Sequence, residues 1–193
     1  MIKHIICLLG PAGSGKSTQL ELLAQKLSIQ EVEMSTLFKQ EVAKKSEISD
    51  AISDYILRGI NIPKDITHKV ITRNLKIDES KEYLVFSNFP RSVEQLEILN
   101  EICLEYDMKL FKFIVMNLSV EESIKRIQNR IATGDYRKDD LNVDAIKNRL
   151  DAFYSGFEDM KESLDRFEEG IVVEIDASQS IEKIHIDILE ILK

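Results

Sequence analysis

Glycine, lysine and hydroxyl side chains are concentrated in one short stretch near the N-terminus, GPAGSGKST, from Gly10 to Thr18. Four residues separate Gly10 from Gly15, and Lys16 and Ser17 follow directly. Glycines allow successive backbone N–H groups to point toward one centre, and such a concave arrangement binds anions. A lysine beside it reaches phosphate oxygens, and a neighbouring hydroxyl contacts Mg²⁺. The stretch therefore predicts a nucleoside triphosphate site.

The residues on either side of this stretch support the same prediction. An apolar run over residues 4–9 precedes it and a helical pattern over residues 16–28 follows it, so the positive end of a helix would face the phosphates. We expect Mg²⁺ to bind together with the nucleotide, near Ser17 and Thr18. The candidate ATP ligands in the stretch are Gly10, Pro11, Ala12, Gly13, Ser14, Gly15, Lys16, Ser17 and Thr18.

Arginine, whose planar group binds phosphate through two parallel hydrogen bonds, lies in several short stretches further along the chain. Arg126 and Arg130 are separated by one helical turn, so both side chains would lie on one face. An acidic pair, 139–140, lies between two others and would hold their guanidinium groups in place. The arginines expected to surround a phosphate-bearing ligand are Arg91, Arg126, Arg130, Arg137 and Arg149.

Short apolar runs alternate with helical patterns along the whole chain. This alternation predicts right-handed β-α-β crossovers and one α/β domain built on a mostly parallel sheet. The strands expected from near-continuous apolar runs cover residues 4–9, 83–87, 110–116 and 171–175. The expected helices cover residues 16–28, 36–45, 48–57, 64–76, 93–106, 119–131, 143–154 and 178–192. Ligands of such sheets bind beyond the carboxyl ends of the strands, so Gly10, Phe89-Pro90 and the residues after Met116 should converge.

Composition excludes several classes of partner. The formal net charge of −8 disfavours a nucleic-acid surface. No apolar stretch approaches the roughly 20 residues of a membrane span. Cys7 and Cys103 have no metal or redox spacing, so we expect reduced thiols and a cytoplasmic protein.

Several motifs, in order, resemble those of the adenylate kinase family of nucleoside monophosphate kinases. They are GPAGSGKSTQL (10–20), LRGINIP (57–63), SNFPRSVEQ (87–95), RIQNR (126–130), YRKDDLNVDAIKNRL (136–150) and EIDASQ (174–179). The resemblance implies a P-loop NTPase fold with a core of residues 1–32, 62–130 and 142–193. It also implies an acceptor-binding insertion at about 33–61 and a lid at about 131–141. The lid is short and lacks cysteines, which implies the form without structural zinc.

The resemblance implies a monomeric enzyme that transfers the γ-phosphoryl group of ATP to AMP and gives two ADP. Gln95 would recognise the acceptor base; pyrimidine-specific relatives tend to carry Asn there, so Gln95 favours AMP. The residues implied to act in phosphoryl transfer are Lys16, Arg91, Arg126, Arg130, Arg137 and Arg149. Arg126 and Gln179 would also bind ATP. The implied AMP ligands are Met34, Lys39, Ile60, Asn61, Ile62, Asn88, Arg91, Gln95, Arg137 and Arg149.

Two departures from the family pattern leave alternatives open. The acidic residue of the family's D-G-F-P-R stretch, which organises water around Mg²⁺, is Ser87 here, and an acceptor-side arginine is Lys39. Loss of that carboxylate weakens the metal's surroundings. A kinase for CMP or UMP, or a nucleotide-binding regulator without turnover, therefore remains an alternative.

Overall fold

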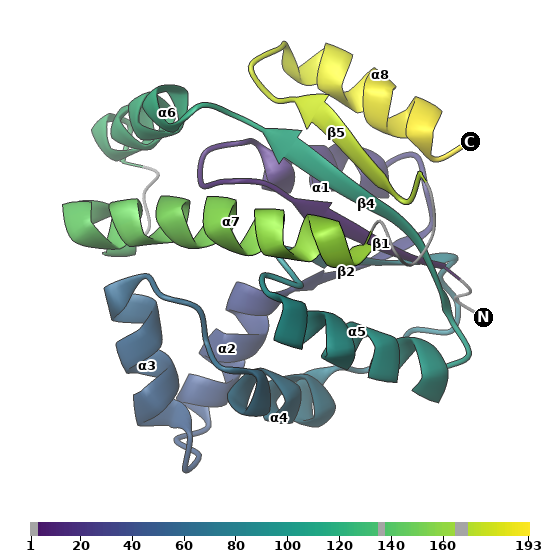
Figure 1. Cartoon of the computed structure of the whole chain (residues 1–193), viewed down its shortest axis with the longest axis horizontal. Coiled ribbons are helices and arrows are strands. Elements are labelled where there is room, and N and C mark those ends of the chain that lie inside the picture. The colour runs from purple at the N-terminus through teal and green to yellow at the C-terminus, as the bar shows by residue number, and fades with distance from the viewer. Residues whose placement is uncertain (1–3, 135–137, 165–169) are drawn as a thin grey trace.

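Five parallel strands form a single sheet in the computed structural model, which describes residues 4–134, 138–164 and 170–193 (Figure 1). The order across the sheet is β2-β3-β1-β4-β5. All neighbouring pairs are parallel, and this confirms the expected α/β fold. The strands are β1 (His4–Leu9), β2 (Ile29–Glu33), β3 (Tyr83–Ser87), β4 (Lys109–Asn117) and β5 (Val172–Asp176).

Helices cover both faces of the sheet, because alternate strand residues point to opposite sides. Along β1, Ile5, Cys7 and Leu9 belong to one buried cluster, and Ile6 and Leu8 belong to another. The first cluster includes residues of α2, α4, α5 and α7, and the second those of α1 and α8. The helices are α1 (Lys16–Ala24), α2 (Met34–Ala43), α3 (Ser49–Arg58), α4 (Lys64–Asn74), α5 (Val93–Glu105), α6 (Val120–Ala132), α7 (Val143–Leu164) and α8 (Ile181–Ile191), with a 3₁₀ turn η1 (Lys138–Leu141).

Strand β2 is an element that the sequence pattern does not predict. Its residues, IQEVE, bury only Ile29 and Val32, and the other three are polar. The strand lies at the edge of the sheet, where only one neighbour, β3, pairs with it. An edge strand needs fewer apolar residues than a central one, so the apolar signal of β2 is too weak to recognise from sequence.

Helix α7 is longer than expected, since it continues to Leu164 and not to residue 154. The buried residues Phe157, Met160 and Leu164 extend its apolar stripe at helical spacing. A glycine at position 156 obscures this continuation, because glycine is a poor helix former. Figure 1 shows the long helix crossing the middle of the molecule, where it contacts α3 and α5.

A buried carboxylate connects α2 to α4, on the face of the sheet that these helices cover. The Glu41 side chain is 1% exposed and accepts hydrogen bonds from Arg73 Nη1 at 3.1 Å and Asn74 Nδ2 at 3.0 Å. Hydrogen bonds from Asn74 and Ser46, together with that from Arg73, lower the pKa of Glu41 from 4.5 to about 2. The charged form of Glu41 is therefore part of the folded state.

This low pKa predicts an acid-sensitive contribution to stability. The unfolded chain takes up the Glu41 proton near pH 4.5 but the folded chain only near pH 2, so the stabilisation is complete above about pH 5 and is lost as the pH falls toward 2. The difference corresponds to about 3 kcal/mol of unfolding free energy. Urea denaturation of wild type and Glu41→Gln between pH 2 and pH 6 measures it. Equal acid loss in both proteins would contradict the assignment; Glu79→Gln, at an exposed position, serves as the control.

Candidate nucleotide-binding site

A cavity of about 640 Å³ lies at the carboxyl ends of the strands, where the sequence analysis expects the motifs to converge. Ser87 ends β3, the glycine stretch follows β1, and Arg126 and Arg130 come from α6, which follows β4. The cavity therefore brings together segments that are distant in sequence. The predicted site residues that line it are Gly10, Pro11, Ala12, Gly13, Gly15, Lys16, Ser17, Thr18, Asn88, Arg91, Arg126, Arg130 and Arg149.

The glycine stretch forms a loop that leads directly into α1. Gly15 precedes the first helical residue with a φ of 90°, a left-handed conformation that glycine adopts without steric cost. The Lys16 ammonium donates to Gly10 O at 2.7 Å, to Pro11 O at 2.9 Å and to Ser14 Oγ at 3.1 Å. These three bonds use the donors of the ammonium and hold it against the loop, so bound phosphate oxygens would replace some of these acceptors. Ser14 is fully buried beneath the loop.

Helix α6 is tied to this loop through Arg126. Ser119 caps the helix by accepting a hydrogen bond from the backbone N–H of Glu122 at 3.2 Å. Arg126 donates through Nε to Glu122 Oε1 at 3.1 Å and through Nη1 to Gly13 O at 3.3 Å. The carboxylate and the loop carbonyl together orient the guanidinium group at the wall of the cavity.

One buried carboxylate holds two arginines of the cavity side by side. Asp140 has a side chain with 0% exposure and accepts from Arg130 Nη2 at 2.5 Å and from Arg149 Nη2 at 2.7 Å. The sequence pattern predicts that the acidic pair holds Arg137 and Arg149. The pairing with Arg149 is confirmed, Arg130 is a partner that the pattern does not indicate, and Arg137 lies outside the described residues.

The loop over residues 88–92 places a further arginine at the cavity. Asn88 adopts a left-handed φ of 58°, which asparagine tolerates better than most residues, and its N–H donates to Leu8 O at 3.1 Å. Arg91 Nε donates to Asn88 O at 3.0 Å. Gln95 supports the loop, since its Oε1 accepts from Arg91 N at 2.9 Å and its Nε2 donates to Ile62 O at 3.1 Å. The Gln95 amide has two N–H donors and two oxygen lone pairs, and these two bonds use one of each. One N–H and one lone pair of the amide are left for a ligand.

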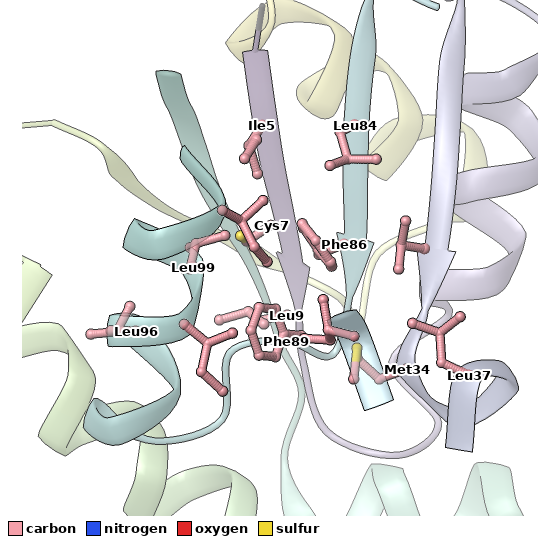
Figure 2. Packing of buried hydrophobic residues seen from close by; sticks show 14 of the residues in the cluster. Ile5, Cys7, Leu9, Met34, Leu37, Leu84, Phe86, Phe89, Leu96 and Leu99 are labelled. Carbon is pink, nitrogen blue, oxygen red and sulfur yellow. The ribbon is translucent and has the colours of Figure 1, made fainter. Parts of the chain in front are cut away.

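The remaining predicted site residues lie away from the lining of this cavity. Met34 is 3% exposed and packs in the hydrophobic core near Leu37 and Phe89 (Figure 2). Lys39 is exposed on α2. Gln179 donates through Nε2 to Asp176 O at 3.1 Å, on a separate surface hollow beside β5. Residues 60–62 precede α4, where the Ile62 carbonyl accepts from Gln95 and Thr67. Binding roles for these residues stay predictions.

The structure adds three lining residues that the sequence does not indicate, Glu21, Glu33 and Phe153, and it places Ser87 in the wall of the cavity as well. Glu33 ends the unpredicted strand β2, and its position could not be inferred without that strand. Phe153 belongs to the apolar stripe of α7 and resembles an ordinary core residue in the sequence. Glu21 follows Ser17 by one helical turn, a spacing that places both on one face of α1.

Comparison with known proteins agrees with this arrangement. The family model described as Adenylate kinase matches residues 8–169. This chain belongs to the adenylate kinase family. It is 34% identical to the adenylate kinase of Thermobifida fusca over 145 residues, which cover 75% of this chain and 76% of the relative. It is 31% identical to that of Azobacteroides pseudotrichonymphae over 188 residues, 96% and 95% of the two chains, and 31% identical to that of Campylobacter hominis over 193 residues, 99% and 96%.

As a member of the adenylate kinase family, the chain is a phosphotransferase. Within it, Gly156 allows helix α7 to lie close to the 88–92 loop of the site. A Cβ atom at this position would lie 2.2 Å from Arg91 O, closer than any real contact, so glycine permits α7 to approach the 88–92 loop. In an exposed helix, alanine would be more stable than glycine by about 1 kcal/mol. Here the added methyl group must displace either the helix or the loop.

We therefore expect Gly156→Ala to lower the free energy of unfolding by about 1–3 kcal/mol, through overpacking. The displaced Arg91 should also raise the KM of the phosphate acceptor. Thermal denaturation and acceptor titration measure the two effects. Ser155→Ala, at the neighbouring exposed position, adds helix propensity without the contact and should not destabilise. A stabilised Gly156→Ala protein would contradict the close approach.

Proposed function

We propose that this chain catalyses the reversible transfer of the γ-phosphoryl group of ATP to AMP, giving two ADP. The observation that carries the proposal is the set of positive side chains around one cavity. Lys16 is the first residue of α1, Arg91 comes from the 88–92 loop, and the others come from α6 and α7. Two polyanions that meet end to end require such charge on both sides.

Each cation has a distinct part in this reaction. Lys16 and the N–H groups of its loop bind the phosphates of ATP, and Arg91 binds the phosphate of the acceptor. Arg130 and Arg149, held by Asp140, stabilise the charge that spreads over the transferring group. Phosphoryl transfer leaves little covalent chemistry to the protein, so positioning and charge stabilisation supply most of the catalysis. Preorganised groups supply that stabilisation without reorienting during the step. Arg126 binds the phosphates of ATP. We assign Arg137 to the arginines that act on the transferring group and on the acceptor.

The acceptor base would lie near Gln95, whose remaining N–H and lone pair match the edge of adenine. Residues 60–62 would contact it through backbone groups, beside the Ile62 carbonyl that Gln95 already binds. We assign Met34, Lys39 and Asn88 to the acceptor side and Gln179 to the adenine of ATP. The insertion at about 33–61 and the lid at about 131–141 would close over the nucleotides and exclude water.

Mg²⁺ bound with ATP would shield the phosphate charges, which is the chemistry that the ion supplies. The residues present suit it, because the hydroxyl residues Ser17 and Ser87 and the carboxylate residues Glu21 and Glu33 line the cavity, and Mg²⁺ prefers oxygen ligands. Ser17 or Thr18 would hold it. We infer no structural zinc for the short lid.

The proposal includes a monomer that acts in the cytoplasm, with small-molecule partners and no nucleic acid. Cys7 and Cys103 are free thiols, and burial raises the pKa of both, which suits reduced, unreactive side chains. Within the described residues, no helix has both the length and the apolar character to cross a bilayer.

An assay that couples ADP formation to NADH oxidation, run with ATP and each nucleoside monophosphate in turn, tests the proposal. We expect the highest kcat/KM with AMP. A higher value with CMP or UMP would change the acceptor, and ATP binding without turnover of any monophosphate would indicate a regulator. Two adenosines joined by five phosphates should bind much more tightly than ATP, because this compound occupies both sites.

A further inference from the structure

A carboxylate from the edge strand lies among the phosphate-binding groups. Glu33 ends β2 and is paired in register with Ser87, the last residue of β3. Both residues line the same cavity as Lys16 and Ser17. Glu33 is half-buried, and Thr36 Oγ1 donates to its Oε2 at 2.8 Å, which restricts the carboxylate at the start of α2.

A negative side chain at this place opposes the binding of a bare triphosphate, because like charges at short range repel. The repulsion becomes attraction when a divalent cation lies between the carboxylate and the phosphates. Mg²⁺ keeps several of its water ligands when it binds to nucleotide phosphates, and nearby carboxylates accept hydrogen bonds from those waters. The position of Glu33 therefore suits the metal complex of the nucleotide better than the free nucleotide.

The other carboxylate of the cavity provides a comparison. Glu21 is exposed on α1, whereas Glu33 is half-buried at the carboxyl end of a strand, where ligands of parallel sheets bind. Ser87, next to Glu33 across the strands, is 3% exposed and supplies only a hydroxyl. Glu33 is thus the carboxylate at this strand end.

We propose that Glu33 is a positioning residue for Mg²⁺: it orients the water ligands of the ion in the complex with ATP and so makes nucleotide binding depend on the metal. This inference rests on the proposed function, since it requires ATP in the cavity. A competing role is structural, in which Glu33 only orients a positively charged side chain of the protein. The two roles differ in one measurable respect, because a structural role affects ATP binding equally with and without Mg²⁺.

Isothermal titration calorimetry of ATP binding, in EDTA and in saturating Mg²⁺, separates these roles. The quantity compared is the ratio of the Kd in EDTA to the Kd in Mg²⁺. We expect Glu33→Gln to lower this ratio about tenfold, the lower end of the effect of such outer ligands. Its Kd in EDTA should be unchanged or tighter. Glu31→Gln, at an exposed position of the same strand and outside the lining of the cavity, is the matched control and should keep the wild-type ratio.

Two further variants test the location of the effect. Glu33→Gln combined with Ser87→Asp returns a carboxylate to the neighbouring strand end and should restore much of the ratio. Ser87→Asp alone should raise the ratio above wild type, and this variant tests the proposal even if Glu33→Gln does not fold. Thermal denaturation verifies folding of each protein.

An unchanged ratio in Glu33→Gln would overturn the inference, as would a Kd that weakens by the same factor in EDTA and in Mg²⁺. A Ser87→Asp protein with an unchanged or lower ratio would also count against it. Failure of the wild-type protein to bind ATP in either buffer would instead overturn the proposed function itself. Normal metal-dependent binding by wild type that none of the variants alters would leave that function standing and remove only the role of Glu33.

Discussion

Replacing Lys16 by methionine is expected to lower kcat/KM for ATP by about a thousandfold, because single preorganised donors to developing charge contribute factors of about 10² to 10³. Methionine keeps the length and apolar stem of lysine but removes the ammonium. That ammonium lies against the phosphate loop, bonded to Gly10 O, Pro11 O and Ser14 Oγ. Its charge would act on both the bound ATP and the transition state, so kcat and KM should both change.

The coupled assay measures this loss, and calorimetry measures the accompanying loss of ATP affinity. Lys26→Met is the control, because Lys26 is exposed just after α1 and does not line the cavity. The melting temperature should be followed as well, since the loop acceptors lose their donor. A folded Lys16→Met protein with a kcat/KM within a few-fold of wild type would refute the role of the ammonium.

Asp140→Asn is expected to reduce kcat by about a hundredfold, comparable to the loss of one preorganised electrostatic contact. Asparagine has nearly the same volume as aspartate, so the change removes charge with little change in packing. Its amide oxygen accepts from one arginine, but its NH₂ group then faces the other guanidinium. Arg130 and Arg149 would therefore repel each other across a site that holds them together in the wild type.

The same substitution should lower the free energy of unfolding by about 3 kcal/mol, since removal of one member of a buried ionic network leaves its partners uncompensated. Steady-state kinetics and urea denaturation measure the two effects. Asp144→Asn, at an exposed position in the first turn of α7, is the matched control. A kcat that is unaffected in Asp140→Asn would show that Arg130 and Arg149 do not need this carboxylate. Asp140→Glu keeps the charge and should recover part of the activity.

The elements that surround the site follow from local patterns of the sequence. The strand, glycine loop and helix over residues 4–24 are short-range features, and the phosphate site depends on residues adjacent in the chain. The capping pair Ser119 and Glu122 likewise marks the start of α6 without any distant contact. Such features are recognisable because hydrogen bonding and apolar periodicity within a few residues determine them.

The partners of the charged side chains depend on tertiary structure. The sequence indicates that the acidic pair holds arginines, but the packing of η1 against α6 and α7 decides that Asp140 receives both Arg130 and Arg149. Gln95 is similar, since its side chain meets Arg91 N and Ile62 O only when segments distant in sequence are brought together. Such contacts leave no periodic signal in the chain.

The sequence by itself determined the order of the helices and of four of the five described strands, the glycine loop and the presence of the arginines that the proposed function uses. Only the tertiary structure decided that the polar segment 29–33 becomes an edge strand, which brings Glu33 beside Ser87, and that Gly156 lies against the Arg91 carbonyl. The reason is physical. Backbone propensity and apolar spacing act over a few residues, whereas strand pairing and close helix contacts depend on surfaces that exist only after the chain has folded.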